Sequence, residues 1–202
     1  MKAGAIIDRA ATLLLDEDGI RWPRADLLTA LADGQREAVL LNPTLHTRTE
    51  GMQCEKGVTQ EAPDEAIKVL GVHRNLGPDG NESGRAIRPV EESVLAAADP
   101  MWASSERAEK QARHWFPDSH SPRRFRLYPP LSRTEHVEIT YSAEPPAPDT
   151  EEDEVALPPV YASALVEYLA YRALAAETDT QGPEKAAAHY QQFARLVGGG
   201  EQ

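Results

Sequence analysis

The chain has 202 residues and a formal net charge of −12, with 41% hydrophobic residues and a single cysteine, Cys54. This length suits one compact domain or a core with an inserted subdomain, and the acidity argues against nonspecific binding to nucleic acid or to an anionic membrane. A lone cysteine excludes an intrachain disulfide and a zinc site built from several thiolates.

Two amphipathic helices are predicted at the start of the chain. In residues 3–16, apolar side chains such as Ile6 and Ala10 recur at helical spacing, and residues 24–41 repeat the pattern after Pro23. Charged residues interrupt the first apolar run too early for a signal peptide, and no apolar run approaches the roughly 20 residues that span a bilayer. We therefore expect a helical hairpin in a protein that is made in the cytoplasm and has no contact with membranes.

Residues 44–148 change to a strand-like pattern. Residues 44–49 alternate, Glu50-Gly51 reads as a turn, and Met52–Glu55 is expected to pair back on the first strand. Further strands are predicted at 63–75, 85–90, 123–130 and 137–141, with a helical turn at 91–98. The proline pairs Pro129-Pro130 and Pro145-Pro146 should end two of these strands, because proline cannot donate to a ladder.

The last quarter is helical again. A helix at 155–176 carries Tyr161, Tyr168 and Tyr171, and a final helix at 183–197 stops at three consecutive glycines. The predicted fold class is α+β, with a helical bundle formed by the N- and C-terminal helices and a β-rich insertion in the middle. The bundle comprises 1–43 and 155–202, the insertion 44–148, and an acidic linker 149–154.

No catalytic, metal or cofactor site is predicted. Neither the spacing of the six histidines nor their distance in sequence from Cys54 matches a metal-ligand motif, and the glycines of 77–84 fit neither a P-loop nor a dinucleotide fingerprint. Cys54 fits a half-buried strand position better than a nucleophile. A hydrolase would need Cys54 and a histidine to be brought together by the fold.

Charged residues leave two readings open in two places. A basic cluster could contact an acidic partner or passing DNA, but the favoured reading is that its arginines pair with the protein's own carboxylates. The acidic run 149–154 is either a solvated linker or the lining of a channel, where it would repel phosphate. The cluster consists of Arg107, Lys110, Arg113, Arg123, Arg124, Arg126 and Arg133.

Five segments, in their order along the chain, resemble the head-to-tail adaptor (connector, head-completion) proteins of tailed bacteriophages, particularly the short-tailed type. The resemblance spans nearly the whole chain and rests on the order of the motifs rather than on any one of them. Where Gln-x-Leu-Pro is expected, the chain has Gln60-Glu61-Ala62-Pro63 and so loses an apolar anchor. The segments are Asp18–Leu28, Lys56–Pro63, Leu70–Asn75, Pro122–Pro130 and Val160–Ala173.

The resemblance implies a non-enzymatic virion protein of the neck, made in the host cytoplasm. Such a protein would dock as a dodecameric ring beneath the portal, extend the DNA channel and offer a platform to a tail or nozzle protein. Its C-terminal segment, here 183–202, would insert against the portal, with Tyr190, Phe193 and Leu196 as anchors. Double-stranded DNA would pass through without specific binding.

Charge suggests how the copies and the DNA would be handled. Arg123, Arg124 and Arg126 could form an inter-subunit basic patch that faces the acidic C-terminal half of a neighbour, since ring contacts join two different surfaces. An acidic channel lining would leave DNA free to slide, because few phosphates would be neutralised. The lining would consist of Asp149, Glu151, Glu152, Asp153 and Glu154. The alternatives are a tail-tube or head-closure subunit, or a small acidic protein that mimics DNA.

Overall fold

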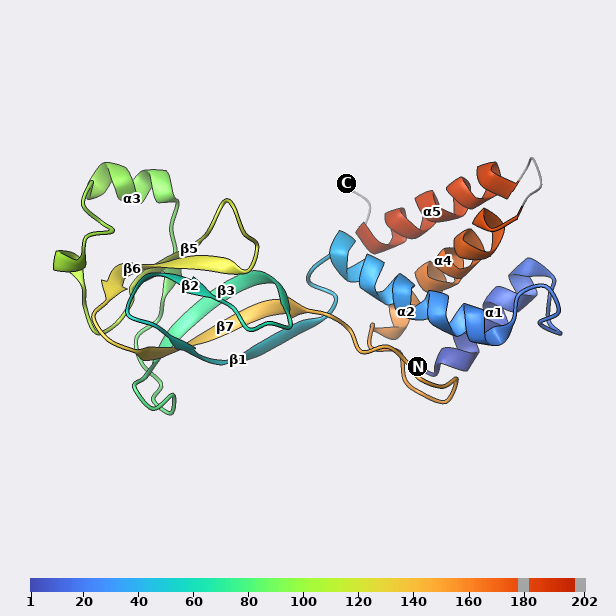
Figure 1. The fold of residues 1–202 in the computed structure, drawn as a ribbon, viewed down its shortest axis with the longest axis horizontal. Coiled ribbons are helices and arrows are strands. Elements are labelled where there is room, and N and C mark those ends of the chain that lie inside the picture. The colour runs from blue at the N-terminus through green and yellow to red at the C-terminus, as the bar shows by residue number, and fades with distance from the viewer. Residues whose placement is uncertain (178–181, 199–202) are drawn as a thin grey trace. The chain divides into compact units, whose positions relative to one another are not determined.

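The computed structural model describes residues 1–177 and 182–198 of the chain, which divides into two compact units (Figure 1). The helical unit comprises Met1–His46 and Glu144–Gln202, and the β unit comprises Thr47–Ala143. The helical unit is therefore assembled from both ends of the sequence, and the β unit from one continuous segment.

Four α-helices make up the described part of the helical unit: α1 (Ala3–Leu14), α2 (Arg24–Leu41), α4 (Ala162–Ala175) and α5 (Gly182–Gly198). Helices α2 and α4 each contact all three of the others, and α4 does so more extensively, so α4 forms the centre of this unit (Figure 1). This position explains why apolar residues occupy nearly every face of α4. The fully buried large side chains of the unit include Ile6, Ile7, Leu31, Leu165, Leu169 and Phe193.

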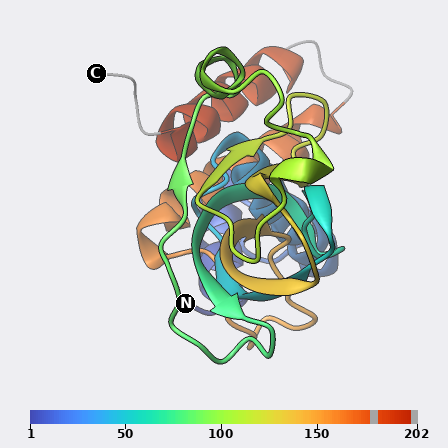
Figure 2. The ribbon, with the colours of Figure 1, turned by 90° about the vertical axis from the view of Figure 1, so that its left-hand side faces the viewer.

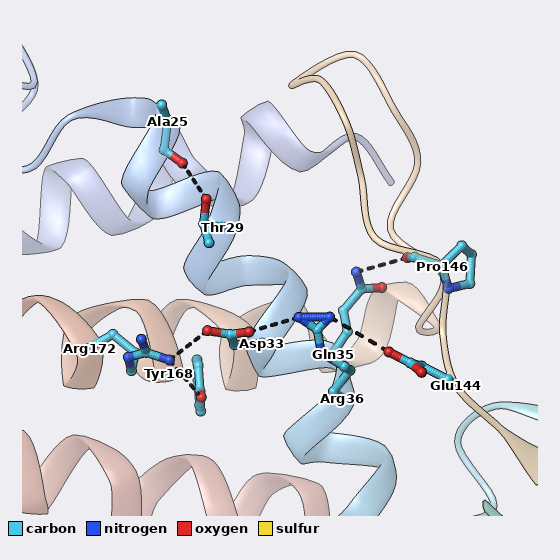
Figure 3. A network of polar contacts seen from close by, with 9 residues as sticks. All are labelled: Ala25, Thr29, Asp33, Gln35, Arg36, Glu144, Pro146, Tyr168 and Arg172. Atoms are coloured by element: carbon cyan, nitrogen blue, oxygen red, sulfur yellow. Dashed lines mark hydrogen bonds and ion pairs between the residues drawn. The ribbon is translucent and has the colours of Figure 1, made fainter.

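Helices α2 and α4 approach closely at one glycine and are tied by polar contacts beside it. A Cβ atom on Gly34 would lie 2.8 Å from Cδ1 of Tyr168, so only glycine admits this ring without a shift. Next to it, Asp33 of α2 accepts a hydrogen bond from Arg172 of α4 at 2.8 Å, and Arg36 bonds the other oxygen of the same carboxylate, also at 2.8 Å (Figure 3). The buried Gln35 side chain accepts a bond from the backbone N–H of Ala156 and so attaches the 144–156 segment to α2.

The β unit consists of two sheets that share one hydrophobic core. Three strands form an antiparallel sheet in the order β1-β7-β3, and four form a sheet in the order β2-β6-β5-β4, in which β4 and β5 run parallel. Figure 2 shows these strands curving around a common interior, where Val72 and Ile139 of one sheet meet Phe125 and Leu127 of the other. The strands are β1 (Thr47–Cys54), β2 (Gly57–Glu61), β3 (Ala66–Gly77), β4 (Arg88–Pro89), β5 (His114–Pro117), β6 (Arg124–Leu131) and β7 (Glu135–Ala143).

The predicted architecture, a helical bundle of N- and C-terminal helices with a β-rich insertion, is wrong. Across 1–177 and 182–198 the fold is a mixture of five α-helices and two sheets, and one helix, α3 (Glu92–Ala98), belongs to the middle of the chain. It packs through Leu95 into a second small core with Trp102 and Phe116. The physical reason is that the middle segment buries its apolar residues in cores of its own.

Several predicted elements are confirmed, and others need correction at their ends. Helices α1, α2 and α5 and strand β3 lie where periodicity predicted them. The helix expected from residue 155 begins only at Ala162, because Pro158 and Pro159 precede it and a 3-10 turn spans Pro159–Tyr161. No helix in the described part of the chain has the length and apolar character needed to cross a membrane.

Two expectations about strands are wrong. No turn occurs at Glu50-Gly51, since β1 continues through both residues and pairs with β7 along its whole length. Strand β6 runs through Pro129 and Pro130 to Leu131. Proline lacks a donor but keeps its carbonyl, and the Pro130 carbonyl accepts a bond from the N–H of Glu109 at 2.9 Å.

Candidate docking surfaces

The three predicted portal anchors lie on α5 in different environments. Phe193 is fully buried, Tyr190 is half-buried, and Leu196 has 37% of its surface exposed. Residues 199–202, the end of the predicted docking segment, lie outside the described residues. In this structure α5 is therefore a packed helix of its unit, and Leu196 is the anchor candidate whose side chain is available to a partner.

Aromatic rings hold α5 on α4. The ring of Phe193 lies 5.0 Å from that of Tyr168, and the ring of Tyr190 lies 5.1 Å from that of Tyr171. The Tyr190 hydroxyl donates a hydrogen bond to Glu37 of α2 at 2.8 Å, and this bond together with burial raises the pKa of Tyr190 to about 12. Aromatic ring pairs add to burial energy, so the tyrosines of this helix pair stabilise the unit itself.

The acidic run 149–154 is folded against the N-terminal helices. Glu151 forms a bidentate pair with Arg24, with distances of 2.8 and 2.6 Å, and this pair lowers the pKa of Glu151. The carboxylate of Asp153 accepts hydrogen bonds from the backbone N–H groups of Asp149 and Thr150. The remaining three acidic residues, Asp149, Glu152 and Glu154, are exposed. Glu152 pairs with Lys2, and Glu154 lies 3.6 Å from the N-terminal amine.

The predicted inter-subunit basic patch is engaged within the β unit. Arg123 pairs with Asp64, Arg124 with Glu61, and Arg126 with both Glu92 and Asp118. These pairs are mostly exposed to solvent, so each contributes little to stability. Each does offset the charge that a neighbouring subunit would meet at this surface.

The residues weighed for catalysis lie in unsuitable surroundings. Cys54 is fully buried, and burial together with the nearby charge of Glu55 raises the pKa of its thiol to about 12. The thiol is therefore protonated at neutral pH, whereas a nucleophilic cysteine reacts as the thiolate. Within the described residues, no group of three histidine, cysteine or acidic side chains is placed to hold a metal ion.

The α1–α2 loop presents an exposed apolar surface that periodicity did not predict. Leu15 is 93% exposed, with a left-handed backbone at φ 57°, and Ile20 is 84% exposed. Between them, the Asp16 carboxylate accepts hydrogen bonds from the N–H groups of Ile20, Arg21 and Trp22. Desolvation raises the pKa of Asp16, but these donors outweigh it and leave the pKa below its ordinary value. A loop whose backbone is held by hydrogen bonds and whose aliphatic side chains, Leu15 and Ile20, are exposed suits a docking surface. The sequence signal was the run of three leucines that ends at the turn.

Comparison with known proteins agrees with the order of motifs in the sequence. Residues 1–201 match the family model described as SU10 adaptor protein. A search of the curated proteins finds no match to the chain. Where the motif Gln-x-Leu-Pro is expected, the chain has alanine in place of leucine. This residue, Ala62, is 3% exposed and part of the β-unit core, so a smaller apolar side chain fills a buried site. Because the match covers both units, the chain belongs to the SU10 adaptor protein family, whose members are bacteriophage head-tail adaptors and thus structural virion proteins.

Proposed function

We propose that the protein forms a dodecameric ring beneath the portal of a short-tailed phage, joins the capsid to a tail or nozzle protein and extends the DNA channel. The observation that carries this proposal is the family match over residues 1–201. Made in the host cytoplasm, the protein would become part of the virion neck and act through its shape and surface, without a catalytic step.

The surfaces of the helical unit support such a role. A ring subunit must offer two different surfaces to its two neighbours and further surfaces to the portal and the tail. The chain offers exposed aliphatic side chains in separate places on this unit, among them Leu15 and Ile20 in one loop and Leu196 at the end of α5. The net charge of −12 suits a channel through which DNA slides without sticking.

The portal contact can be tested at the end of α5. We expect Leu196→Glu to weaken docking on purified portal rings by at least about tenfold, because it places a charge where an exposed apolar side chain would be desolvated by the partner. Docking would be measured by imaging mixtures of portal and protein and by counting occupied portals across a concentration series.

Ala187→Glu is the matched control, since Ala187 is exposed on the same helix and the change in charge is equal. Deleting 183–202 would be a poorer test, because it removes the buried Phe193 and so destabilises the unit. Unchanged docking of Leu196→Glu would remove this residue as an anchor. If the unmodified protein adds no ring to the portal and stays monomeric, the proposed function fails.

The acidic lining is tested by reversing those charges that do not support the local fold. The triple variant Asp149→Lys, Glu152→Lys and Glu154→Lys spares Glu151 and Asp153, which make internal hydrogen bonds. We expect intact assembly and DNA ejection slowed several-fold, because lysines would bind passing phosphates. Ejection from virions that carry the variant would be followed with a DNA-binding dye. The charge-matched control is Glu55→Lys, Asp79→Lys and Glu106→Lys, at three exposed positions of the β unit. Normal ejection would rule out a channel position for this run.

A further inference from the structure

A pocket of about 240 Å³ in the β unit is lined by Arg85, Ala86, Arg88, Arg113 and His114. We refer to it as the arginine pocket. Three of its five lining residues are arginines and one is a histidine, in a chain whose net charge is −12. The pocket is therefore lined by positively charged residues, whereas the chain as a whole is negatively charged.

Two of these arginines differ from all others in the described residues, 1–177 and 182–198. Arg85 and Arg88 have exposed side chains with no hydrogen bond or ion pair, whereas every other arginine there has a side-chain or backbone partner. Glu109 binds the guanidinium of Arg113 with both carboxylate oxygens and offsets its charge. The charges of Arg85 and Arg88 are left uncompensated at the pocket.

Two further nitrogen atoms of the lining residues are buried without a partner in the described protein. They are Nε of Arg113 and Nδ1 of His114. A buried polar atom without a hydrogen bond costs free energy, and such atoms are uncommon in native folds. Both atoms are hidden from solvent, so the exposed side chains of Arg85 and Arg88 are the groups of this pocket that can meet an oxygen ligand.

The backbone around the pocket is fixed by a buried amide. Asn75 is fully buried, and its Nδ2 donates to the carbonyls of Arg85 and Ala112 at 2.9 Å each, while its Oδ1 accepts from the N–H of Ala112. Asn75 thereby joins the two segments that carry the arginines. Ile87 is buried between Ala86 and Arg88, so strand alternation directs Arg88 outward. The backbone segments that carry the lining residues are thus joined before a ligand arrives.

We propose that the arginine pocket binds a carboxylate presented by an acidic segment of another protein chain. The planar fork of arginine matches a carboxylate with two parallel hydrogen bonds, and a pocket of this size accepts one acidic side chain. A DNA duplex fits less well, because its binding requires many phosphates to be neutralised along a path, and the net charge of the chain repels it. This inference concerns the β unit and holds whether or not the protein forms a ring.

The test uses the full chain and a capped hexaglutamate peptide labelled with a dye, titrated by fluorescence anisotropy at constant ionic strength. We expect saturable binding that is at least about tenfold weaker in the double variant Arg85→Glu and Arg88→Glu, since charge-assisted hydrogen bonds are lost and repulsion is added. The double variant Lys56→Glu and Lys68→Glu is the control, because it changes the net charge by the same amount. Both lysines lie in the β unit, are exposed and have no ion pair among the described residues.

Three outcomes would overturn the proposal. The first is the absence of saturable peptide binding to the unmodified chain, and the second is an equal loss in the two double variants, which would indicate general charge attraction. The third is binding of a short DNA duplex that depends on Arg85 and Arg88 more strongly than peptide binding does. Thermal unfolding of each variant would show that it is folded at the temperature of the titration, and hexaglutamine would show the binding that does not depend on carboxylates.

Discussion

Phe193→Ala is expected to lower the free energy of unfolding of the helical unit by about 3–5 kcal/mol, the usual cost of truncating a buried phenylalanine. Phe193 is fully buried, and its ring contacts those of Tyr168 and Tyr190 at 5.0 and 6.0 Å between centroids. Alanine would leave a cavity between α4 and α5 and remove both ring contacts. Chemical denaturation followed by far-ultraviolet circular dichroism measures the loss, because the signal is dominated by the helices.

Leu196→Ala is the matched control on the same helix. Leu196 is 37% exposed, so its truncation should cost about 1 kcal/mol or less. A loss in Phe193→Ala no larger than in Leu196→Ala would show that α5 is not packed on α4 in solution. That result would restore Phe193 as a side chain available to the portal.

The comparison of the two residues bears on how α5 could dock. If α5 remained on α4 in the assembled neck, a partner would meet Leu196 and the exposed part of Tyr190 but not Phe193. For Phe193 to serve as an anchor, the helix would first have to leave its unit, and the partner would have to replace the burial that is lost. The loss of stability in Phe193→Ala gives the part of that cost that comes from the Phe193 ring.

Local periodicity predicts helices well in this chain but cannot predict strand partners. The apolar spacing in 3–16 and 24–41 follows a helical period and locates α1 and α2. Strand β1 pairs with β7, and Thr49 lies opposite Thr140. Nothing within residues 44–55 carries that information, so a local hairpin with a turn at Glu50-Gly51 was the natural but wrong prediction. The compact β unit depends on such distant pairings.

The candidate surfaces show the same limit of sequence reasoning. Arg123, Arg124 and Arg126 stand out as a basic cluster in the sequence, yet the fold places an acidic partner beside each. Arg85 and Arg88 do not stand out, because acidic residues surround them in sequence, but the fold leaves both unpaired within the described residues. Composition shows how many charges are present, whereas pairing depends on tertiary structure.

Asn75→Ala is expected to lower the free energy of unfolding of the β unit by about 3 kcal/mol or more, because it removes three buried hydrogen bonds. Ala112, which is fully buried, would lose the partners of both its N–H and its carbonyl. Denaturation followed by tryptophan fluorescence measures the effect, since Trp102 and Trp115 both lie in this unit. Ser83→Ala, at an exposed loop position, should change stability little.

Asn75→Asp separates hydrogen bonding from packing, because it keeps the size of the side chain. Its carboxylate would face the carbonyl oxygens of Arg85 and Ala112, and burial would raise its pKa above the unfolded value. An acid with a raised folded pKa loses stability as the pH rises through the unfolded and then the folded value, so this variant should be closer to the unmodified chain near about pH 4 than near about pH 7. The deficit of Asn75→Ala should show no such dependence.

Asn75 also lies outside the lining of the arginine pocket, which allows its positioning role to be tested. At a temperature where Asn75→Ala is still folded, hexaglutamate binding should weaken, although Arg85 and Arg88 are unchanged, because the segments that carry the pocket residues are no longer joined. Peptide binding equal to that of the unmodified chain would show that the pocket does not depend on this amide. A pre-formed arrangement binds more tightly than the same residues on mobile segments, because less conformational entropy is lost on binding.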